Sequence, residues 1–279
     1  MNANLSLPTQ VADFIRNRRS RNLFLQATIP ATSASIAAVF CAPFSEERQK
    51  SYRVHYRLAQ FLAERGITCF RFDYLGSGDS DGNSIEASID TMVEDTCDVV
   101  AHARALHEAD HLYLVGTRLG ATIAALAAER SRDLAGIALL FPVIDGRRYW
   151  EELVRQQQVE VLAASLRPMS RSEVERQLEE RGYVELESNR ISREMAVKLR
   201  NLDLRRVPAA FRGRVLSVSL EGDHPLRDGT SEVLANYEKC GCRTEQSNDE
   251  ALDCWTPRSM YDGYVPSNTF KRVSGWLQS

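Results

Sequence analysis

The stretch Val115–Ala121, VGTRLGA, has the glycine spacing of a turn that presents a catalytic nucleophile, but its central residue is an arginine. In enzymes that cleave esters and amides, the pattern Gly-x-Ser-x-Gly joins a strand to a helix and exposes the serine hydroxyl on a strained turn. Gly116 and Gly120 match the flanking glycines, and Arg118 occupies the serine position. The alternative is an ordinary strand-to-helix turn whose glycines only allow close packing.

The acid and the base of such a site would follow later in the chain, in the order serine, acid, histidine. In SLEGDHPLRDG a strand pattern ends at Asp223, which is the candidate acid; the alternative is a turn before a helix that begins at Thr230. The base is expected near residues 248–259, yet no histidine lies beyond His224. The serine and the histidine are therefore both missing, and His224 beside Asp223 would be out of place as a substitute.

The segment CAPFSEERQKS follows the first predicted core strand and would complete an oxyanion hole. One backbone N–H of such a hole comes from the residue after the nucleophile, here Leu119, and the other comes from this segment. Pro43 has no N–H, so Phe44 or Ser45 is the predicted second donor. The alternative is helix capping, with Ser45 as the N-cap residue.

An arginine at the turn would point into a pocket and would need an anionic partner, because an unpaired buried charge is costly. The expected partners are Glu46 and Glu47, in the first turn of the next predicted helix, and Asp223. One hypothesis is a structural ion pair that fills the pocket. The other is that the planar guanidinium of Arg118 binds a carboxylate or phosphate of a ligand through two hydrogen bonds.

The loop in FRFDYLGSGDSDG is predicted to be structural, because Gly76, Gly78 and Gly82 do not fit the nucleotide-binding pattern Gly-x-Gly-x-x-Gly. Asp73 and Asp79 are expected to hold it by hydrogen bonds to backbone amides, as short acidic side chains do in turns. The predicted pocket comprises Ser45, Glu46, Glu47, Asp73, Gly76 and His224. The candidate replacement nucleophiles are Ser45, Ser77 and Cys41, each of which also has a simpler structural role.

Strands that alternate with helices predict an α/β fold with a mostly parallel central sheet flanked by helices. A charge-rich helical segment, in which no strand is predicted, fills the stretch from Asp145 to Arg206. We therefore expect a core of residues 1–144 and 208–279 and a helical cap insertion at 145–207. The core strands are predicted within Arg21–Pro30, Ser35–Pro43, Ile67–Tyr74, Leu112–Val115, Leu134–Val143, Gly213–Asp223 and Cys242–Ser247.

Composition excludes several classes of protein. A chain of 279 residues buries a large core without disulfides or metal ions. A net charge of -3 gives no indication of nucleic-acid binding, and no apolar run is long enough to span a bilayer. The six cysteines lack the spacing of a zinc site, so neither a metal nor a cofactor is expected. Because no signal peptide is recognisable, a cytoplasmic location is expected.

Four of these motifs together resemble the serine aminopeptidase-like group of the α/β-hydrolase superfamily. They are APFSEERQKS, FDYLGSGDS, GTRLGA and FPVIDGRRY, and they occur in this order between residues 36 and 155. The likeness extends to the exosortase A system-associated hydrolases of type 2, which are similar also in the arginine at the turn. The resemblance implies an α/β-hydrolase fold and classification as a hydrolase, but no particular substrate.

Two functional interpretations follow. In the first, the protein cleaves an ester, thioester or amide through an atypical site around Arg118 and Asp223, with Phe44 and Leu119 as oxyanion-hole donors. In the second, it is a non-catalytic pseudohydrolase that binds a small carboxylate or acyl ligand, or a partner protein, in a biosynthetic pathway. Under both, the expected partner is a small-molecule or carrier-bound acyl group and not a nucleic acid, and a homodimer is left open.

Overall fold

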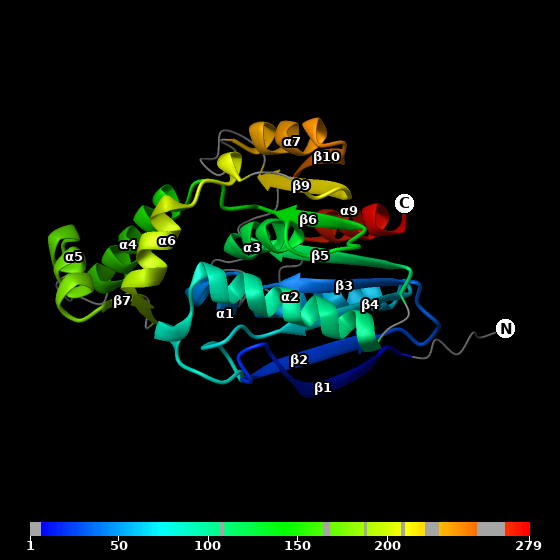
Figure 1. Ribbon diagram of the computed structural model, residues 1–279, viewed down its shortest axis with the longest axis horizontal. Helices are drawn as coiled ribbons and strands as arrows, with labels where there is room; N and C mark the ends of the chain where they lie inside the picture. The colour runs from blue at the N-terminus through cyan, green and yellow to red at the C-terminus, as the bar shows by residue number, and fades with distance from the viewer. Residues whose placement is uncertain are drawn as a thin grey trace.

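The computed structural model describes residues 7–106, 109–163, 168–186, 189–207, 210–220, 229–249 and 266–279 (Figure 1). The strands are β1 (Thr9–Arg16), β2 (Asn22–Ile29), β3 (Ile36–Cys41), β4 (Ile67–Phe72), β5 (His111–Thr117), β6 (Gly136–Leu140), β7 (Tyr183–Leu186), β8 (Asn189–Ser192), β9 (Arg214–Leu220) and β10 (Arg243–Asp249). The helices are α1 (Ser45–Ala63), α2 (Ile89–Leu106), α3 (Leu119–Ala128), α4 (Gly146–Ala163), α5 (Arg171–Glu180), α6 (Arg193–Asn201), α7 (Thr230–Lys239) and α9 (Ser267–Gln278), with short 3-10 turns η1 (Ser84–Glu86) and η2 (Leu204–Arg206).

One eight-stranded sheet forms the centre of the molecule, in the order β1-β2-β4-β3-β5-β6-β9-β10. The strands from β4 to β10 in that order are parallel, whereas β2 runs antiparallel to β4 and to β1 at one edge. Parallel strands covered on both faces are apolar throughout, and every residue of β4 and β6 is buried. The mostly parallel sheet flanked by helices confirms the predicted fold class.

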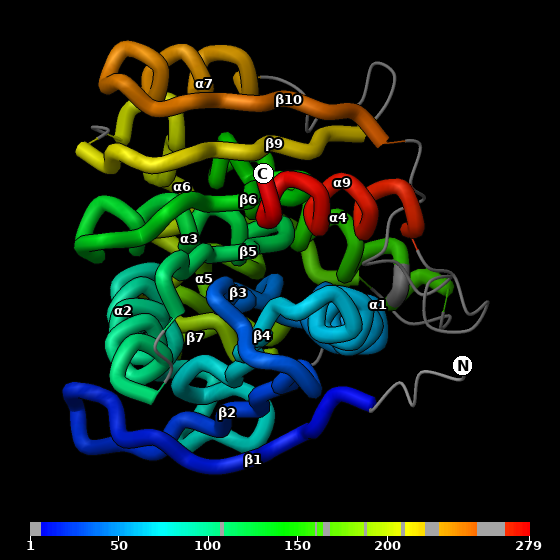
Figure 2. The backbone as a smooth tube through the Cα atoms, turned by 90° about the vertical axis from the view of Figure 1, so that its right-hand side faces the viewer, coloured from blue at the N-terminus to red at the C-terminus, as the bar shows by residue number. Residues whose placement is uncertain are grey.

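Helices cover both faces of this sheet (Figure 2). On one face α1 and α9 pack through residues such as Leu58 and Trp276, and on the other α2, α3 and α7 pack through residues such as Met92, Ile123 and Val233. All residues of α3 except one are buried, since its small and aliphatic side chains allow the helix to approach the sheet closely. The turn that precedes α3 is therefore enclosed by the core.

The segment between β6 and β9 contains α4, α5, β7, β8 and α6, and we call it the cap segment. It lies beyond the ends toward which the parallel strands point (Figure 1). The expectation that no strand interrupts it is wrong, because β7 and β8 pair antiparallel, with Tyr183 opposite Ser192. Val184, Leu186 and Ile191 are buried and alternate with more exposed polar residues. This short period-two pattern is hard to recognise within a segment so rich in charge.

The strand β1 was also not predicted. Only Ile15 of its eight residues is buried, so its apolar side chains give no clear two-residue period. β1 pairs along its whole length with β2 and forms the exposed edge of the sheet. Among the helices that the structure describes, none is long and apolar enough to cross a membrane.

Candidate active site

The turn between β5 and α3 has a strained backbone of the kind that presents a nucleophile. Arg118 has φ 55° and ψ -124°, a conformation that is unfavourable for a residue with a Cβ atom. Its N–H donates to the carbonyl of Leu140 at 2.9 Å, and its own carbonyl accepts from the N–H of Ala121 at 3.0 Å. These bonds tie the turn to the end of β6 and to α3, so Arg118 is held at the carboxyl end of β5.

Both glycines of the turn are required by space. A Cβ atom on Gly116 would lie 2.4 Å from the carbonyl oxygen of Gly120, and one on Gly120 would lie 2.2 Å from the carbonyl oxygen of Cys41. Real Cβ atoms do not approach backbone this closely, so α3 could not pack against β3 and β5 with any larger residue at these positions. The glycine pattern therefore reports a close backbone approach, as the sequence predicts for this kind of turn.

The side chain of Arg118 is completely buried and forms ion pairs with two glutamates from different parts of the chain. Its Nε donates to Oε1 of Glu47 at 2.8 Å, and its Nη2 donates to Oε2 of Glu152 at 2.9 Å. The hydroxyl of Tyr149 donates to Oε2 of Glu47 at 2.8 Å, and the Tyr149 ring centroid lies 5.2 Å from the Cζ of Arg118. We call these four residues the Arg118 cluster.

The electrostatics of the cluster keep the arginine charged. Burial alone lowers the pKa of the Arg118 guanidinium, but the charges of Glu47 and Glu152 outweigh burial and raise this pKa above its ordinary value. Burial raises the pKa of the Glu47 carboxyl, and the opposite effects of the Arg118 charge and the Tyr149 hydroxyl offset it only in part. A guanidinium with a raised pKa remains protonated, so Arg118 is neither a nucleophile nor a base at neutral pH.

Two members of the cluster, Tyr149 and Glu152, were not predicted. They are three residues apart on α4 and therefore lie on the same face of that helix. A signal was present in the sequence, because a buried arginine requires acidic partners and Glu151 and Glu152 follow soon after FPVIDG. Which of the two glutamates faces Arg118 depends on the rotation of α4 about its axis, and tertiary packing determines that rotation.

Of the partners predicted for Arg118, Glu47 contacts it and Glu46 does not. Glu46 instead forms an ion pair at 2.9 Å with Lys50, one turn along α1. Both glutamates lie in the first turn of α1, but only Glu47 faces the buried side of the helix. Their different environments follow from the helical period, which places consecutive residues about 100° apart.

The prediction that Ser45 is the N-cap of α1 is wrong. The N-cap position is Phe44, which makes no side-chain capping bond, and Ser45 is the first helical residue with a φ of 56°. The Oγ of Ser45 instead accepts a hydrogen bond at 3.1 Å from the Nδ2 of Asn189 in β8 of the cap segment. A long-range partner thus replaces the local backbone amide as the donor to this hydroxyl.

Asp73 holds the loop that follows β4, as predicted, whereas Asp79 contributes its backbone N–H and no side-chain hydrogen bond to a described residue. Its Oδ2 accepts from the backbone N–H of Asp79 at 3.0 Å, and its carboxylate forms an ion pair with Arg48 of α1. Gly76 has a φ of 78°, and a Cβ atom there would lie 2.2 Å from the carbonyl oxygen of Asn83. Asp73 and Gly76 of the loop motif therefore have structural roles, which these contacts explain.

Phe44, Ser45 and Gly76 line one cavity of about 140 Å³ between the start of α1, the loop after β4 and the cap segment. Phe44 and Leu119 carry the two backbone N–H groups predicted to form the oxyanion hole. In the described part of the chain neither N–H has a hydrogen-bond acceptor. Asp223 and His224 lie outside the described residues, as does 250–265, which includes most of the segment where the base is expected, so their roles stay predictions.

None of the three candidate replacement nucleophiles is activated by a described residue. Burial raises the pKa of the Cys41 thiol to about 12, so this thiol is protonated at neutral pH. Ser77 donates from Oγ to the carbonyl of Tyr74 at 2.9 Å, and Ser45 has Asn189 as its partner. A nucleophile of this kind needs a base within hydrogen-bond reach, and the described contacts of these groups provide none.

His55 lies beside the turn but has a structural role. Its Nε2 is 2.9 Å from the Oγ1 of Thr117, the residue that precedes Arg118. Burial, together with the charges of Arg71 and Arg48, lowers the pKa of His55 to about 3. The imidazole is therefore neutral at physiological pH and ties α1 to the end of β5.

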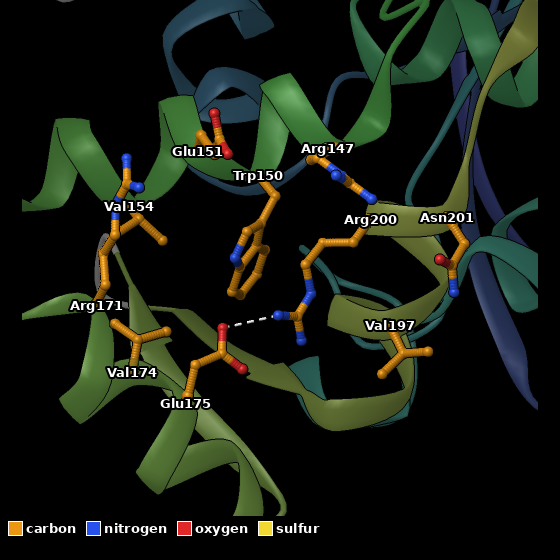
Figure 3. A pocket seen from close by; sticks show the side chains of 10 residues that line it. All are labelled: Arg147, Trp150, Glu151, Val154, Arg171, Val174, Glu175, Val197, Arg200 and Asn201. Atoms are coloured by element: carbon orange, nitrogen blue, oxygen red, sulfur yellow. Dashed lines mark hydrogen bonds and ion pairs between the residues drawn. The ribbon is translucent and has the colours of Figure 1, made fainter.

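A second cavity, of about 460 Å³, lies within the cap segment between α4, α5 and α6 (Figure 3). The indole of Trp150 forms part of its wall, and the Cζ of Arg200 lies 5.3 Å from the Trp150 ring centroid. Arg200 also forms an ion pair at 2.7 Å with Glu175. The cavity is further lined by apolar Val154, Val174 and Val197, by basic Arg147 and Arg171, and by Glu151 and Asn201.

The profile of the family described as serine aminopeptidase, S33, matches residues 47–199. No curated protein matches the sequence. Among solved structures, Est1E from Butyrivibrio proteoclasticus with bound ferulic acid is 16% identical with a TM-score of 0.66, over 96% of this chain and 98% of that chain.

Two other solved structures show the same likeness. The α/β hydrolase GrgF from Penicillium sp. sh18 is 19% identical with a TM-score of 0.66, over 97% of this chain and 98% of that chain. The esterase Pf2001 from Pyrococcus furiosus is 12% identical with a TM-score of 0.65, over 99% of this chain and 92% of that chain. At these identities the structures show a common α/β-hydrolase fold and no common activity.

Proposed function

The chain belongs to the serine aminopeptidase family, S33, and within this family we propose that it is a pseudohydrolase, which binds a ligand or a partner without cleaving it. One observation carries this proposal: the nucleophile position holds Arg118, whose buried side chain is ion-paired with Glu47 of the core and Glu152 of the cap segment. Breaking such a buried pair by removing one partner is strongly unfavourable. A substrate carbonyl at the turn would meet a closed ionic cluster in place of a hydroxyl.

The charge of the cluster argues against Arg118 as the residue that binds an anionic ligand. One cation and two carboxylates leave the cluster with a formal charge of about -1. An incoming carboxylate would have to displace Glu152 from Nη2 without gaining any attraction from net positive charge. The structural ion pair is therefore the better supported of the two hypotheses for Arg118.

The cavity of the cap segment is the better candidate for the ligand. Its volume of about 460 Å³ is within the range of small-molecule sites. Valines and the Trp150 indole suit an acyl or aryl body, while Arg147 and Arg171 add positive charge for a carboxylate. We propose a small carboxylate or an acyl group, free or attached to a carrier, as the ligand. The motif likeness to exosortase A system-associated hydrolases of type 2 makes a biosynthetic setting part of the proposal.

One observation favours a second candidate, an atypical hydrolase. The N–H groups of Phe44 and Leu119 have no acceptor among the described residues, and the turn keeps its strained backbone. Preorganised N–H donors alone retain part of the catalytic effect when a catalytic triad is removed. Such an enzyme would act on activated esters or thioesters near Arg118.

Mass spectrometry of the intact protein separates these candidates. The wild type and Arg118→Ala are incubated with acetyl and octanoyl thioesters and with p-nitrophenyl esters, and product release is followed in parallel, with an active esterase as the positive control. We expect no acyl adduct and no product above the buffer rate from either protein. Turnover by the wild type that Arg118→Ala loses would contradict the pseudohydrolase proposal and support the atypical hydrolase.

Titration calorimetry with octanoate tests the ligand. We expect saturable binding to the wild type and at least tenfold weaker binding to Trp150→Leu, because this change removes an aromatic wall of the cavity. Phe14→Leu is the matched control, since it also replaces an aromatic ring by leucine but lies on β1 and does not line the cap cavity. Equal affinities for the wild type and Trp150→Leu would exclude this cavity as the octanoate site.

A further inference from the structure

Arg71 of β4 is a buried cation without a carboxylate partner among the described residues. The residue is 7% exposed, and its Nη2 donates to the amide oxygen Oε1 of Gln26 at 2.7 Å. Nε is buried and has no acceptor, and no hydrogen bond joins Nη1 to any part of the chain that the structure describes. An unpaired buried charge costs stability, so a protein that keeps one has a position where an anion would be bound favourably.

The side chains around Arg71 hold its guanidinium in one place. Gln26 lies directly opposite it on β2. The Cζ of Arg71 lies 5.2 Å from the ring centroid of Tyr52 and 5.3 Å from that of Tyr56, both on α1. The hydroxyl of Tyr52 also donates to Oε1 of Gln26, at 3.3 Å. Two cation–π contacts and one hydrogen bond thus orient the fork of donors before any ligand arrives.

Arg71 lines a cavity of about 350 Å³, bounded by β2, the end of β4, α1 and the loop after β4. Phe24, Gln49 and Tyr52 supply aromatic and amide walls. Arg48 also lines this cavity, but its charge is used by its ion pair with Asp73. Asp79 is the other acidic group of the wall, and no ion pair joins it to Arg71.

The charges of the two arginines also act on a neighbouring histidine. The charges of Arg71 and Arg48, after burial itself, contribute to the lowered pKa of His55. His55 lies on α1, between the two tyrosine positions that flank Arg71. A low-dielectric setting of this kind strengthens the attraction for an anion.

We propose that this cavity is a binding site for a small oxyanion, a carboxylate or phosphate group, which accepts hydrogen bonds from the guanidinium of Arg71. The aromatic walls suit a planar body attached to that group. The site is separate from the Arg118 cluster and from the cap cavity, with neither of which it shares a lining residue. It therefore does not depend on whether the protein is a pseudohydrolase.

Calorimetric titration of the full chain in low-chloride buffer tests this site, with sodium benzoate in one arm and inorganic phosphate in the other. We expect saturable binding of at least one of the two anions. For Arg71→Gln we expect a Kd about 10- to 100-fold higher, the effect of losing charged hydrogen bonds. Arg65→Gln is the matched control, because Arg65 stacks on Phe61 at 3.5 Å but is exposed and already paired with Glu64. Its Kd should equal that of the wild type.

Thermal unfolding separates a binding role from a structural one. If Arg71 exists to bind an anion, Arg71→Gln without ligand should have a Tm equal to or above that of the wild type, while the rise in Tm caused by the bound anion disappears. The proposal is overturned if neither anion binds the wild type, if Arg71→Gln binds as tightly as the wild type, or if Arg71→Gln alone lowers the Tm by more than Arg65→Gln does.

Discussion

Replacement of Arg118 by methionine is the most direct test of the ionic cluster at the nucleophile position. The change removes the guanidinium from Glu47, which is only 3% exposed, and from Glu152, which is 25% exposed and can be hydrated. Breaking a buried ion pair from one side costs about 3–5 kcal/mol, and most of this cost should come from Glu47. We therefore expect Arg118→Met to lower the free energy of unfolding, measured in urea at pH 8, by that amount.

The pH dependence of this loss has a definite sign. The Arg118 charge lowers the pKa of Glu47, so its removal raises further a pKa that burial already holds above the ordinary value. A carboxyl whose pKa is raised on folding stabilises the folded state at low pH, and this contribution is lost as the pH rises through the folded pKa. The difference between wild type and Arg118→Met should therefore be smaller at pH 4.5 than at pH 8.

A second substitution separates the charge effect from a loss of packing. Adding Glu47→Gln to Arg118→Met removes the remaining buried charge and should restore stability to within about 1–2 kcal/mol of the wild type. The control Arg190→Met breaks an exposed pair with Glu185 and should leave the free energy of unfolding nearly unchanged, because water screens such a pair. The reasoning is refuted if Arg118→Met is as stable as Arg190→Met, or if Glu47→Gln rescues nothing.

Three further predictions concern the surroundings of the cluster. Glu152→Gln should cost about 1 kcal/mol in urea unfolding, less than Arg118→Met, because the partly exposed glutamate is screened by water; an equal cost would contradict this. Gly120→Ala should yield no stably folded protein by circular dichroism, since its Cβ would lie 2.2 Å from a backbone oxygen. Gly275→Ala, which has open space in α9, should instead gain about 0.5–1 kcal/mol of stability. A stably folded Gly120→Ala would disprove the close approach. Because the pKa of His55 is lowered from 6.5 to about 3, the unfolded state takes up a proton below pH 6.5 while the folded state stays neutral. Stability is therefore present above pH 6.5 and is lost as the pH falls, by about 2 kcal/mol at pH 5. His55→Gln should lose less stability between pH 7 and pH 5 than the wild type.

Much of the local structure could be predicted from the sequence. Short apolar runs indicated the strands of the sheet, and a 3.6-residue apolar period indicated the helices, because both patterns record which sides of an element are buried. Gly116 and Gly120 indicated a close backbone approach, which the positions of their missing Cβ atoms confirm. The partner Glu47 was also predictable, because a buried arginine requires an acid and the residues after the first core strand lie near the turn in this fold.

Other features depend on contacts that no local pattern records. Glu152 faces Arg118, and Glu151 lines the cap cavity instead, only because α4 packs with one particular rotation. Ser45 has Asn189 as its partner because the cap segment contains a strand pair that its charge-rich sequence does not reveal.

Arg71 illustrates the same limit most clearly. The segment ITCFRFDY predicted a core strand, but not that an arginine on it lacks an acidic partner among the described residues. The antiparallel register of β2 against β4 places Gln26 opposite Arg71, 45 positions apart in the chain, and α1 adds two tyrosine rings. The sequence by itself determined which faces are buried, because burial follows from periodicity along the chain. Only the tertiary structure decided which charges meet, because strand register and helix rotation are set by the packing of the whole core.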